Sequence, residues 1–175
     1  MGDRMDEPPA SLCNAPDSSR VHCRWADAAE AEQVAALVGL LLSEISDRAA
    51  VPAFGPGLPE LTQTLRKMLE HGHYQAVLAT NGDQLLGVAT VAQSHALYAG
   101  GTIGVIQEFY VDPAHRSTGV GSQMLSRIQA LAERRGWHAL ELCTPPLPAF
   151  DRTLLFYAAH GFNPSGGRKM RWSRP

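Results

Sequence analysis

Two glycines stand in a short polar stretch between a strand-like segment and a helix-like segment. The strand-like run is Ile106–Val111, the polar stretch is Asp112–Ser122 with Gly119 and Gly121, and the helix-like run is Gly119–Arg135. Glycine lets backbone N–H groups come close to an anion, and the start of a helix adds its positive dipole end. A diphosphate is a natural occupant of such a site, although Gly-x-Gly turns also serve plain packing.

Two spaced motifs resemble those of one enzyme family. The run Arg116-Ser117-Thr118-Gly119-Val120-Gly121 matches the Q/R-x-x-G-x-G/A signature of the GNAT superfamily of N-acetyltransferases. Downstream, Leu155–Phe162 resembles the "FY-x-x-x-GF" helix of the same family, and a helix and a strand separate the two motifs as they do there. Two matches in order are more specific than either alone. The resemblance extends over residues 20–172 and is detailed in the C-terminal half.

The resemblance implies that acetyl-CoA is the co-substrate, and no metal is expected because no set of residues has metal-ligand spacing. Backbone N–H groups of the loop would hold the pyrophosphate, and a strand would pair with the pantetheine arm by β-augmentation. The residues implied in cofactor binding are Phe109, Tyr110, Val111, Arg116, Ser117, Thr118, Gly119, Val120, Gly121, Ser122 and Asp151. The family often has glycine where Ser117 stands, and commonly asparagine where Asp151 stands. A carboxylate only accepts hydrogen bonds, so we interpret Asp151 first as a helix N-cap and second as a cofactor contact.

Two side chains are candidates for the chemistry. The resemblance places Tyr157 near the coenzyme sulfur, where a phenol with an ordinary pKa of about 10 stays protonated and can donate to the leaving thiolate. The alternative is a core tyrosine. Glu108 lies on the expected cofactor strand, and alternation sends its side chain to the face opposite Phe109. Glu108 would act as a base through water or attract a cationic substrate, and the alternative is a solvent-facing glutamate.

We therefore expect direct acetyl transfer from acetyl-CoA to a primary amine, with a small molecule as the acceptor. A non-catalytic acyl-CoA-binding or regulatory module and a protein N-terminal or lysine acetyltransferase are the alternatives. A nucleotide-binding protein is a third, but no Lys-Ser/Thr follows Gly121 as a P-loop requires. A cysteine intermediate is not expected, because Cys143 falls in a predicted buried strand. Glu44, Asp47 and Glu108 would make an acidic pocket that favours a cationic amine, unless they are ordinary surface charges.

The elements that must position these residues predict an α+β fold. We expect a mixed, mostly antiparallel sheet flanked by helices, and the resemblance implies splayed central strands, as in the acyl-CoA N-acyltransferase fold. An Asp27 N-cap with Glu30 forms a capping box before the first helix, and Asn81-Gly82 predicts a hairpin. The expected strands are Val21–Trp25, Tyr74–Thr80, Leu85–Ala92, Gly104–Val111, Ala139–Cys143 and Arg168–Trp172. The expected helices follow Asp27, begin near Pro59, follow Gly119, and extend from Asp151 to His160.

Composition favours one globular domain over residues 21–175, preceded by a disordered or pendant tail at residues 1–20. The net charge of −2 gives no general reason to bind nucleic acid or an anionic membrane. The three cysteines form no C-x-x-C pair, and no apolar run is long enough to span a bilayer, so a cytoplasmic location is expected. The pair His71 and His73 lacks further ligands at metal-site spacing. Pairing through a free strand edge would make a homodimer.

Overall fold

The computed structural model describes residues 21–52, 55–165, 170 and 172. The expected N-terminal tail and most of the expected strand Arg168–Trp172 lie outside these residues. The described residues form a five-stranded sheet with the order β1-β2-β3-β4-β5, in which only the β4–β5 pair is parallel. The strands are β1 (His22–Trp25), β2 (Gln75–Asn81), β3 (Gln84–Ala96), β4 (Gly101–Val111) and β5 (Ala139–Leu142).

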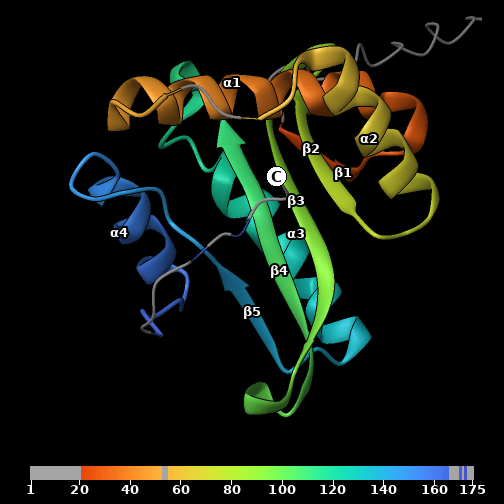
Figure 1. The fold of residues 1–175 in the computed structure, drawn as a ribbon, viewed down its shortest axis with the longest axis vertical. Helices are drawn as coiled ribbons and strands as arrows, with labels where there is room; N and C mark the ends of the chain where they lie inside the picture. Colours follow the sequence, from red (N-terminus) through yellow and green to blue (C-terminus); the bar gives the residue numbers. More distant parts are fainter. Residues whose placement is uncertain (1–20, 53–54, 166–169, 171, 173–175) are drawn as a thin grey trace, which may run out of the picture.

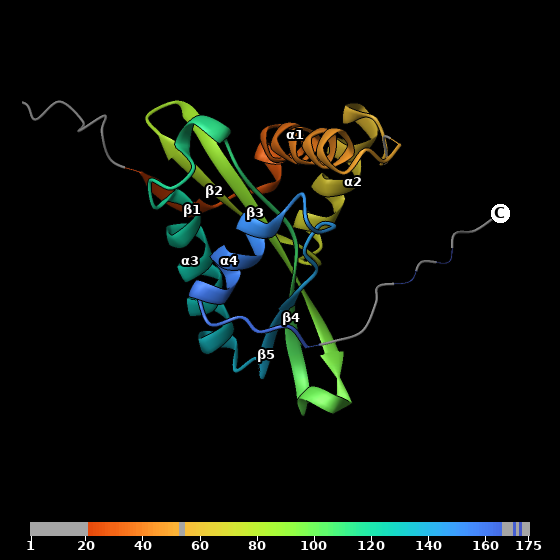
Figure 2. The ribbon, with the colours of Figure 1, turned by 90° about the vertical axis from the view of Figure 1, so that its left-hand side faces the viewer.

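Helices cover both faces of this sheet (Figures 1 and 2). The α-helices are α1 (Ala31–Ala49), α2 (Leu58–Glu70), α3 (Val120–Arg135) and α4 (Asp151–Ala159), and 3-10 turns occupy Ala28–Glu30, Leu97–Ala99 and Pro113–His115. Alternation along β2 divides the core: Val77 and Ala79 pack with α3, whereas Ala76 and Leu78 pack with α1 and α2. The mixed, mostly antiparallel α+β architecture expected from the sequence is confirmed.

The parallel strands β4 and β5 separate after a short paired stretch (Figure 1). Their register extends from Ile103 opposite Ala139 to Ile106 opposite Leu142, and β4 then continues to Val111 without β5 beside it. The splay predicted between central strands is therefore present, and it exposes one edge of the C-terminal half of β4.

A β-bulge distorts β4 where the splay begins. Ala89 pairs with Phe109 but Val91 pairs with Ile106, so the single residue Thr90 lies opposite two residues of β4. The extra residue puts Ile106 and Phe109 on the same face of the sheet although three positions separate them. Two-residue alternation along the whole strand would have put them on opposite faces.

Local signals located the elements, and the structure corrects several of their ends. The largest differences are that β3 continues to Ala96 rather than ending at Ala92, and that β4 begins at Gly101 rather than at Gly104. The capping box is confirmed, because the Asp27 carboxylate accepts the Ala29 N–H at 2.8 Å and the Glu30 carboxylate accepts the Asp27 N–H at 3.1 Å. The hairpin after β2 turns at residues 82–83, one position later than expected. Strand β5 ends before Cys143, whose side chain is exposed rather than buried.

A further correction concerns Asp151. The N-cap position of α4 is Phe150, and no side chain caps the helix there. Asp151 is the first helical residue, where its negative charge lies at the positive end of the helix dipole. The interpretation of Asp151 as the N-cap is therefore wrong by one position.

Candidate active site

A cavity of about 760 Å³ opens where β4 and β5 separate. It lies between α1, the loop after β4, the start of α3, and α4 with its preceding loop. Its wall includes nine of the residues expected from the sequence: Phe109, Tyr110, Val111, Arg116, Ser117, Gly119, Gly121, Ser122 and Tyr157. Four expected residues are not in the wall, namely Glu108, Thr118, Val120 and Asp151. Val120 is buried in the core instead, and the Thr118 hydroxyl donates to the His115 carbonyl at 2.7 Å.

The two glycines of the loop serve different purposes. Gly119 has a positive φ of 90°, and a Cβ at this position would meet no atom within 4 Å, so the space beside its backbone is open. A Cβ on Gly121 would lie 3.2 Å from the Phe156 ring, so this glycine lets the first turn of α3 approach α4. The open backbone at Gly119 fits an anion, whereas the absence of a side chain at Gly121 serves packing.

The open edge of β4 presents backbone groups to the cavity. The Asp112 N–H donates to the Leu86 carbonyl of β3 at 2.8 Å, and the Glu108 N–H donates to the Thr90 hydroxyl of β3 at 3.1 Å. Because the backbone groups of successive strand residues point to opposite sides, those of Phe109 and Val111 point away from β3, toward the side that β5 has left. This edge can pair with an extended ligand bearing amide groups.

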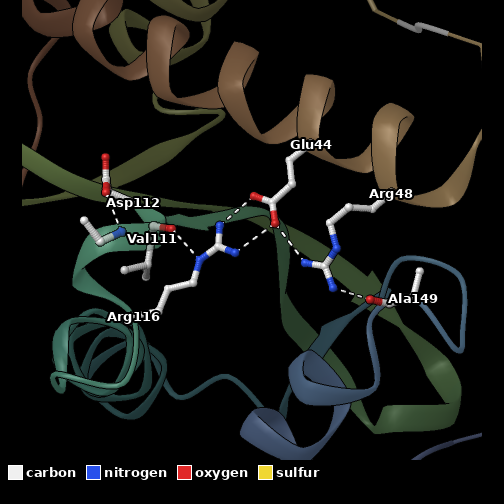
Figure 3. A network of polar contacts seen from close by, with 7 residues as sticks. Glu44, Arg48, Val111, Asp112, Arg116 and Ala149 are labelled. Carbon is white, nitrogen blue, oxygen red and sulfur yellow. Dashed lines mark hydrogen bonds and ion pairs between the residues drawn. The ribbon is translucent and has the colours of Figure 1, made fainter.

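Arg116 is held by two elements rather than pointing freely into the cavity (Figure 3). Its Nη1 and Nη2 atoms donate to the two oxygens of Glu44 on α1, at 2.8 and 2.5 Å, and its Nε donates to the Val111 carbonyl at 2.9 Å. Glu44 also accepts from Arg48 at 2.8 Å, and Arg48 donates in turn to the Ala149 carbonyl. The hydrogen bonds from Arg116 are the main cause of the lowered pKa of Glu44. The network ties α1 to both loops that border the cavity.

Tyr157 lies at the inner wall of the cavity among aromatic rings. Its side chain is 6% exposed, and its ring contacts those of Phe109, Phe156 and Phe162 with centroids 5.2 to 5.8 Å away. Burial raises the pKa of the Tyr157 phenol above its ordinary value, so the hydroxyl stays protonated at neutral pH. Among the described residues no hydrogen-bond partner occupies this hydroxyl. A buried phenol with an unused O–H can donate to a ligand atom.

Glu108 lies on the other face of β4, as strand alternation predicts. Its carboxylate accepts a hydrogen bond from the Thr90 hydroxyl. Burial raises the pKa of the nearby Tyr74 phenol, and the negative charge of Glu108 raises it further. Thr90 is fully buried. Glu108 is thus half-buried beside Thr90 and Tyr74, on the face of the sheet that α1 and α2 cover, and it is not part of the cavity wall.

Two groups at the site have no clear signal in the sequence. His160 bridges α4 and α3: its Nδ1 lies 2.7 Å from the Phe156 carbonyl and its Nε2 lies 2.9 Å from Ser122 Oγ. A carbonyl only accepts, so Nδ1 donates to it, and in the neutral ring Nε2 accepts from the Ser122 hydroxyl. Arg48 is the second group. Its spacing to Glu44 predicts a helix ion pair, but nothing local predicts that this pair faces the cavity.

The expectation of an acidic pocket is wrong. Glu44 lines the cavity but is shared by two guanidinium groups, and neither Asp47 nor Glu108 belongs to the wall. The described residues contain no cluster of three or more His, Cys, Asp and Glu side chains able to hold a metal ion. In the same part of the chain, no helix combines the length and apolar character needed to cross a membrane.

A mixed sheet that splays beside a glycine loop defines the acyl-CoA N-acyltransferase fold. A family model described as "Acetyltransferase (GNAT) domain" matches residues 72–164, more than half of the chain. The chain therefore belongs to the GNAT acetyltransferase family. Among curated proteins, none matches it in sequence.

Solved structures share this fold over most of their length. An aminoglycoside N-acetyltransferase in complex with CoA has a TM-score of 0.74 at 17% identity, covering 92% of this chain and 99% of that one. A transcriptional regulator from Bacillus halodurans C-125 has a TM-score of 0.70 at 23% identity, covering 87% and 100%. A protein from Clostridium acetobutylicum, described as a predicted acetyltransferase and solved with acetyl-CoA, has a TM-score of 0.66 at 19% identity, covering 87% and 96%. At these identities the likeness establishes the fold.

Proposed function

We propose that this protein transfers an acetyl group from acetyl-CoA directly to a primary amine of a small molecule. The observation that carries the proposal is the cavity that joins three parts: the open backbone at Gly119, the free edge of β4, and the protonated hydroxyl of Tyr157. These suit, in order, a pyrophosphate, a pantetheine arm with two amides, and a departing thiolate. The structural neighbours solved with CoA and acetyl-CoA support this choice of donor.

In the proposed complex the loop Arg116–Ser122 binds the donor mainly through its backbone. Gly119 admits the pyrophosphate, and Ser122 contacts it from the first turn of α3. Arg116 acts by holding the loop against α1, because its donors are taken by Glu44 and Val111. Phe109, Tyr110 and Val111 supply the strand along which pantetheine lies, and an N–H of this strand faces the developing oxyanion. Asp151 and Thr118 lie outside the cavity wall, so no direct contact with the donor is proposed for them.

The proposed reaction needs two proton transfers. The neutral amine attacks the thioester carbonyl carbon, the C–N bond forms and the C–S bond breaks. The nitrogen gives up its proton to Glu108 through a water molecule, and Tyr157 gives its hydroxyl proton to the leaving sulfur and regains one from solvent. Glu108 is proposed as a relayed base because it lies behind the wall, hydrogen-bonded to Thr90.

The test of the proposal is release of free thiol from acetyl-CoA in the presence of a panel of amines. Tyr157→Phe is expected to lower kcat about a hundredfold or more while leaving the affinity for acetyl-CoA within twofold, since only the proton donor is lost. Tyr98→Phe is the matched control, because Tyr98 is an exposed tyrosine bonded to Glu141 at the far hairpin. Unchanged turnover in Tyr157→Phe would remove Tyr157 from the mechanism.

Glu108→Gln separates a base from a structural glutamate. We expect the acidic limb of the pH profile of kcat/KM to disappear, because glutamine cannot accept the proton. A limb that stays in place would exclude Glu108 as the base. Thiol release without an acetylated amine, or CoA binding without turnover on any amine, would favour the non-catalytic module instead.

A further inference from the structure

The charged side chains of the cavity wall are mostly cationic. The charged residues in the wall are three arginines, Arg48, Arg116 and Arg152, and one carboxylate, Glu44. Three positive charges and one negative charge leave a net charge of +2. Glu44 accepts three N–H bonds from Arg48 and Arg116 together, so it compensates only one of these two cations. A cavity of this charge favours an anionic group in its ligand.

Arg48 is the arginine placed to recognise that group at the acceptor. It extends from the last turns of α1 and lies with its guanidinium 4.1 Å from the centroid of the Phe150 ring. Two of its five N–H groups donate to the described residues, one to Glu44 and one to the Ala149 carbonyl. Apolar side chains of Leu41 and Ile45 lie on the same wall. Arg48 thus presents a planar, positively charged guanidinium that is held in place beside apolar side chains, and this arrangement suits a carboxylate.

Position separates Arg48 from the expected phosphate site. Figure 3 places Arg116 beside the start of α3, whereas Arg48 lies on the other side of Glu44, above α4. The phosphates of the donor are assigned to the Gly119 end of the cavity. The cation at Arg48 is therefore left for the acceptor.

We propose that the acceptor is an amino acid, a molecule whose primary amine is acetylated while its carboxylate binds Arg48. This proposal rests on the proposed acetyltransferase function and names its substrate class. The nearby guanidinium charges would also disfavour the ammonium form of the acceptor, and so increase the neutral amine that attacks the thioester.

Matched pairs of acceptors test the proposal with the full chain and acetyl-CoA. The pairs are ω-amino acids of two to six carbons and the corresponding amides, which keep the amine and lose the charge. We expect kcat/KM to be at least about tenfold higher for the best carboxylate than for its amide. Arg48→Gln should reduce this preference to within about twofold, Arg48→Lys should retain part of it, and Arg66→Gln, a surface charge change on α2, should retain all of it.

Other outcomes overturn the proposal in distinguishable ways. Equal use of acids and amides by the wild type would exclude a carboxylate subsite. Loss of coenzyme A affinity in Arg48→Gln, with the acid preference intact, would assign Arg48 to the donor phosphates. If the wild type acetylates no amine, the proposed function fails. Calorimetric titration of the CoA-bound protein with the same pairs then tests the carboxylate subsite by itself. Binding of the acids but not of the amides, lost in Arg48→Gln, supports the subsite. Equal binding of acids and amides overturns it.

Discussion

Ser117 adopts a conformation that its residue type disfavours, in the middle of the proposed phosphate loop. Its φ is +64°, in the left-handed region where a side chain costs about 1–2 kcal/mol relative to glycine. This is the position at which the resembling family often has glycine. The backbone thus keeps the glycine conformation although the residue has changed.

Replacing Ser117 by glycine is expected to stabilise the protein by up to about 1 kcal/mol. The gain is smaller than the strain relieved, because glycine also adds conformational freedom to the unfolded chain. Urea unfolding of Ser117→Gly against the wild type measures the difference. Ser117→Val is the opposing control and should lose stability. If Ser117→Gly is less stable than the wild type, the serine side chain holds the loop and strain is not the dominant effect.

Thr90 holds the bulge that aims Glu108. Its hydroxyl accepts the Glu108 N–H and donates to the Glu108 carboxylate, and the residue has no exposed surface. A buried hydroxyl that serves both a backbone donor and a charge cannot be replaced by solvent.

Thr90→Val is expected to lower the free energy of unfolding by about 1–3 kcal/mol, although valine has the same shape and is more apolar. The loss arises because the Glu108 N–H loses its acceptor and the Glu108 carboxylate loses one of its hydrogen bonds. Thr90→Ser keeps the hydroxyl and should cost less. Chemical denaturation compares the three proteins, and a valine variant as stable as the wild type would mean that the bulge holds without this hydroxyl.

Among the elements, α1 carries the side chains that connect the two loops of the site. Glu44 and Arg48, one turn apart, reach the loop after β4 and the loop before α4 respectively. Glu44 is mostly buried, with 19% of its side chain exposed, so water screens the Arg116 and Arg48 charges only in part.

Glu44→Gln should lower the free energy of unfolding by about 2 kcal/mol at pH 7. The pKa of Glu44 is lower in the folded than in the unfolded protein, chiefly through the hydrogen bonds from Arg116. Its stabilising effect is therefore complete above the unfolded pKa of about 4.3 and disappears as the pH falls through the lower folded pKa. Denaturation at pH 7 and at successively lower pH should show the two proteins converging below about pH 4.3. A difference independent of pH would exclude the ionised pair as its cause.

At the scale of the whole molecule, the cavity proposed for the donor is lined by residues of α1, β4, α3 and α4. A ligand that binds only the folded state shifts the unfolding equilibrium in proportion to its occupancy. The cavity crosses these four elements, so a bound coenzyme would join them.

Coenzyme A at one hundred times its Kd is expected to stabilise the protein by about 2.7 kcal/mol, which corresponds to a rise in Tm of roughly 5–10 °C for a chain of this size. Thermal unfolding monitored by circular dichroism measures the shift, with ATP at equal concentration as the control. A shift with ATP that equals or exceeds that with coenzyme A would favour a nucleotide-binding protein and contradict the proposed donor.

Most of the secondary structure could be predicted because its signals are local. The capping box of Asp27 and Glu30, the apolar face of α3 and the hairpin near Gly82 each depend on residues within a few positions of one another. The errors at Cys143, after the end of β5, and at Asp151, at the start of α4, are shifts of one residue. Local signals define the ends of an element less sharply than its interior.

The sequence by itself determined the order of the elements, the alternation that divides the core, and the two motifs that identify the GNAT family. Only the tertiary structure decided the charge of the cavity and the hydrogen bond between Thr90 and Glu108. Arg116 meets Glu44 across 72 residues, and Arg48 meets Ala149 across 101. Such contacts depend on how the sheet splays and bulges, and no local pattern encodes them. For this reason the sequence predicted the donor site, whereas an acceptor class could be proposed only from the folded cavity.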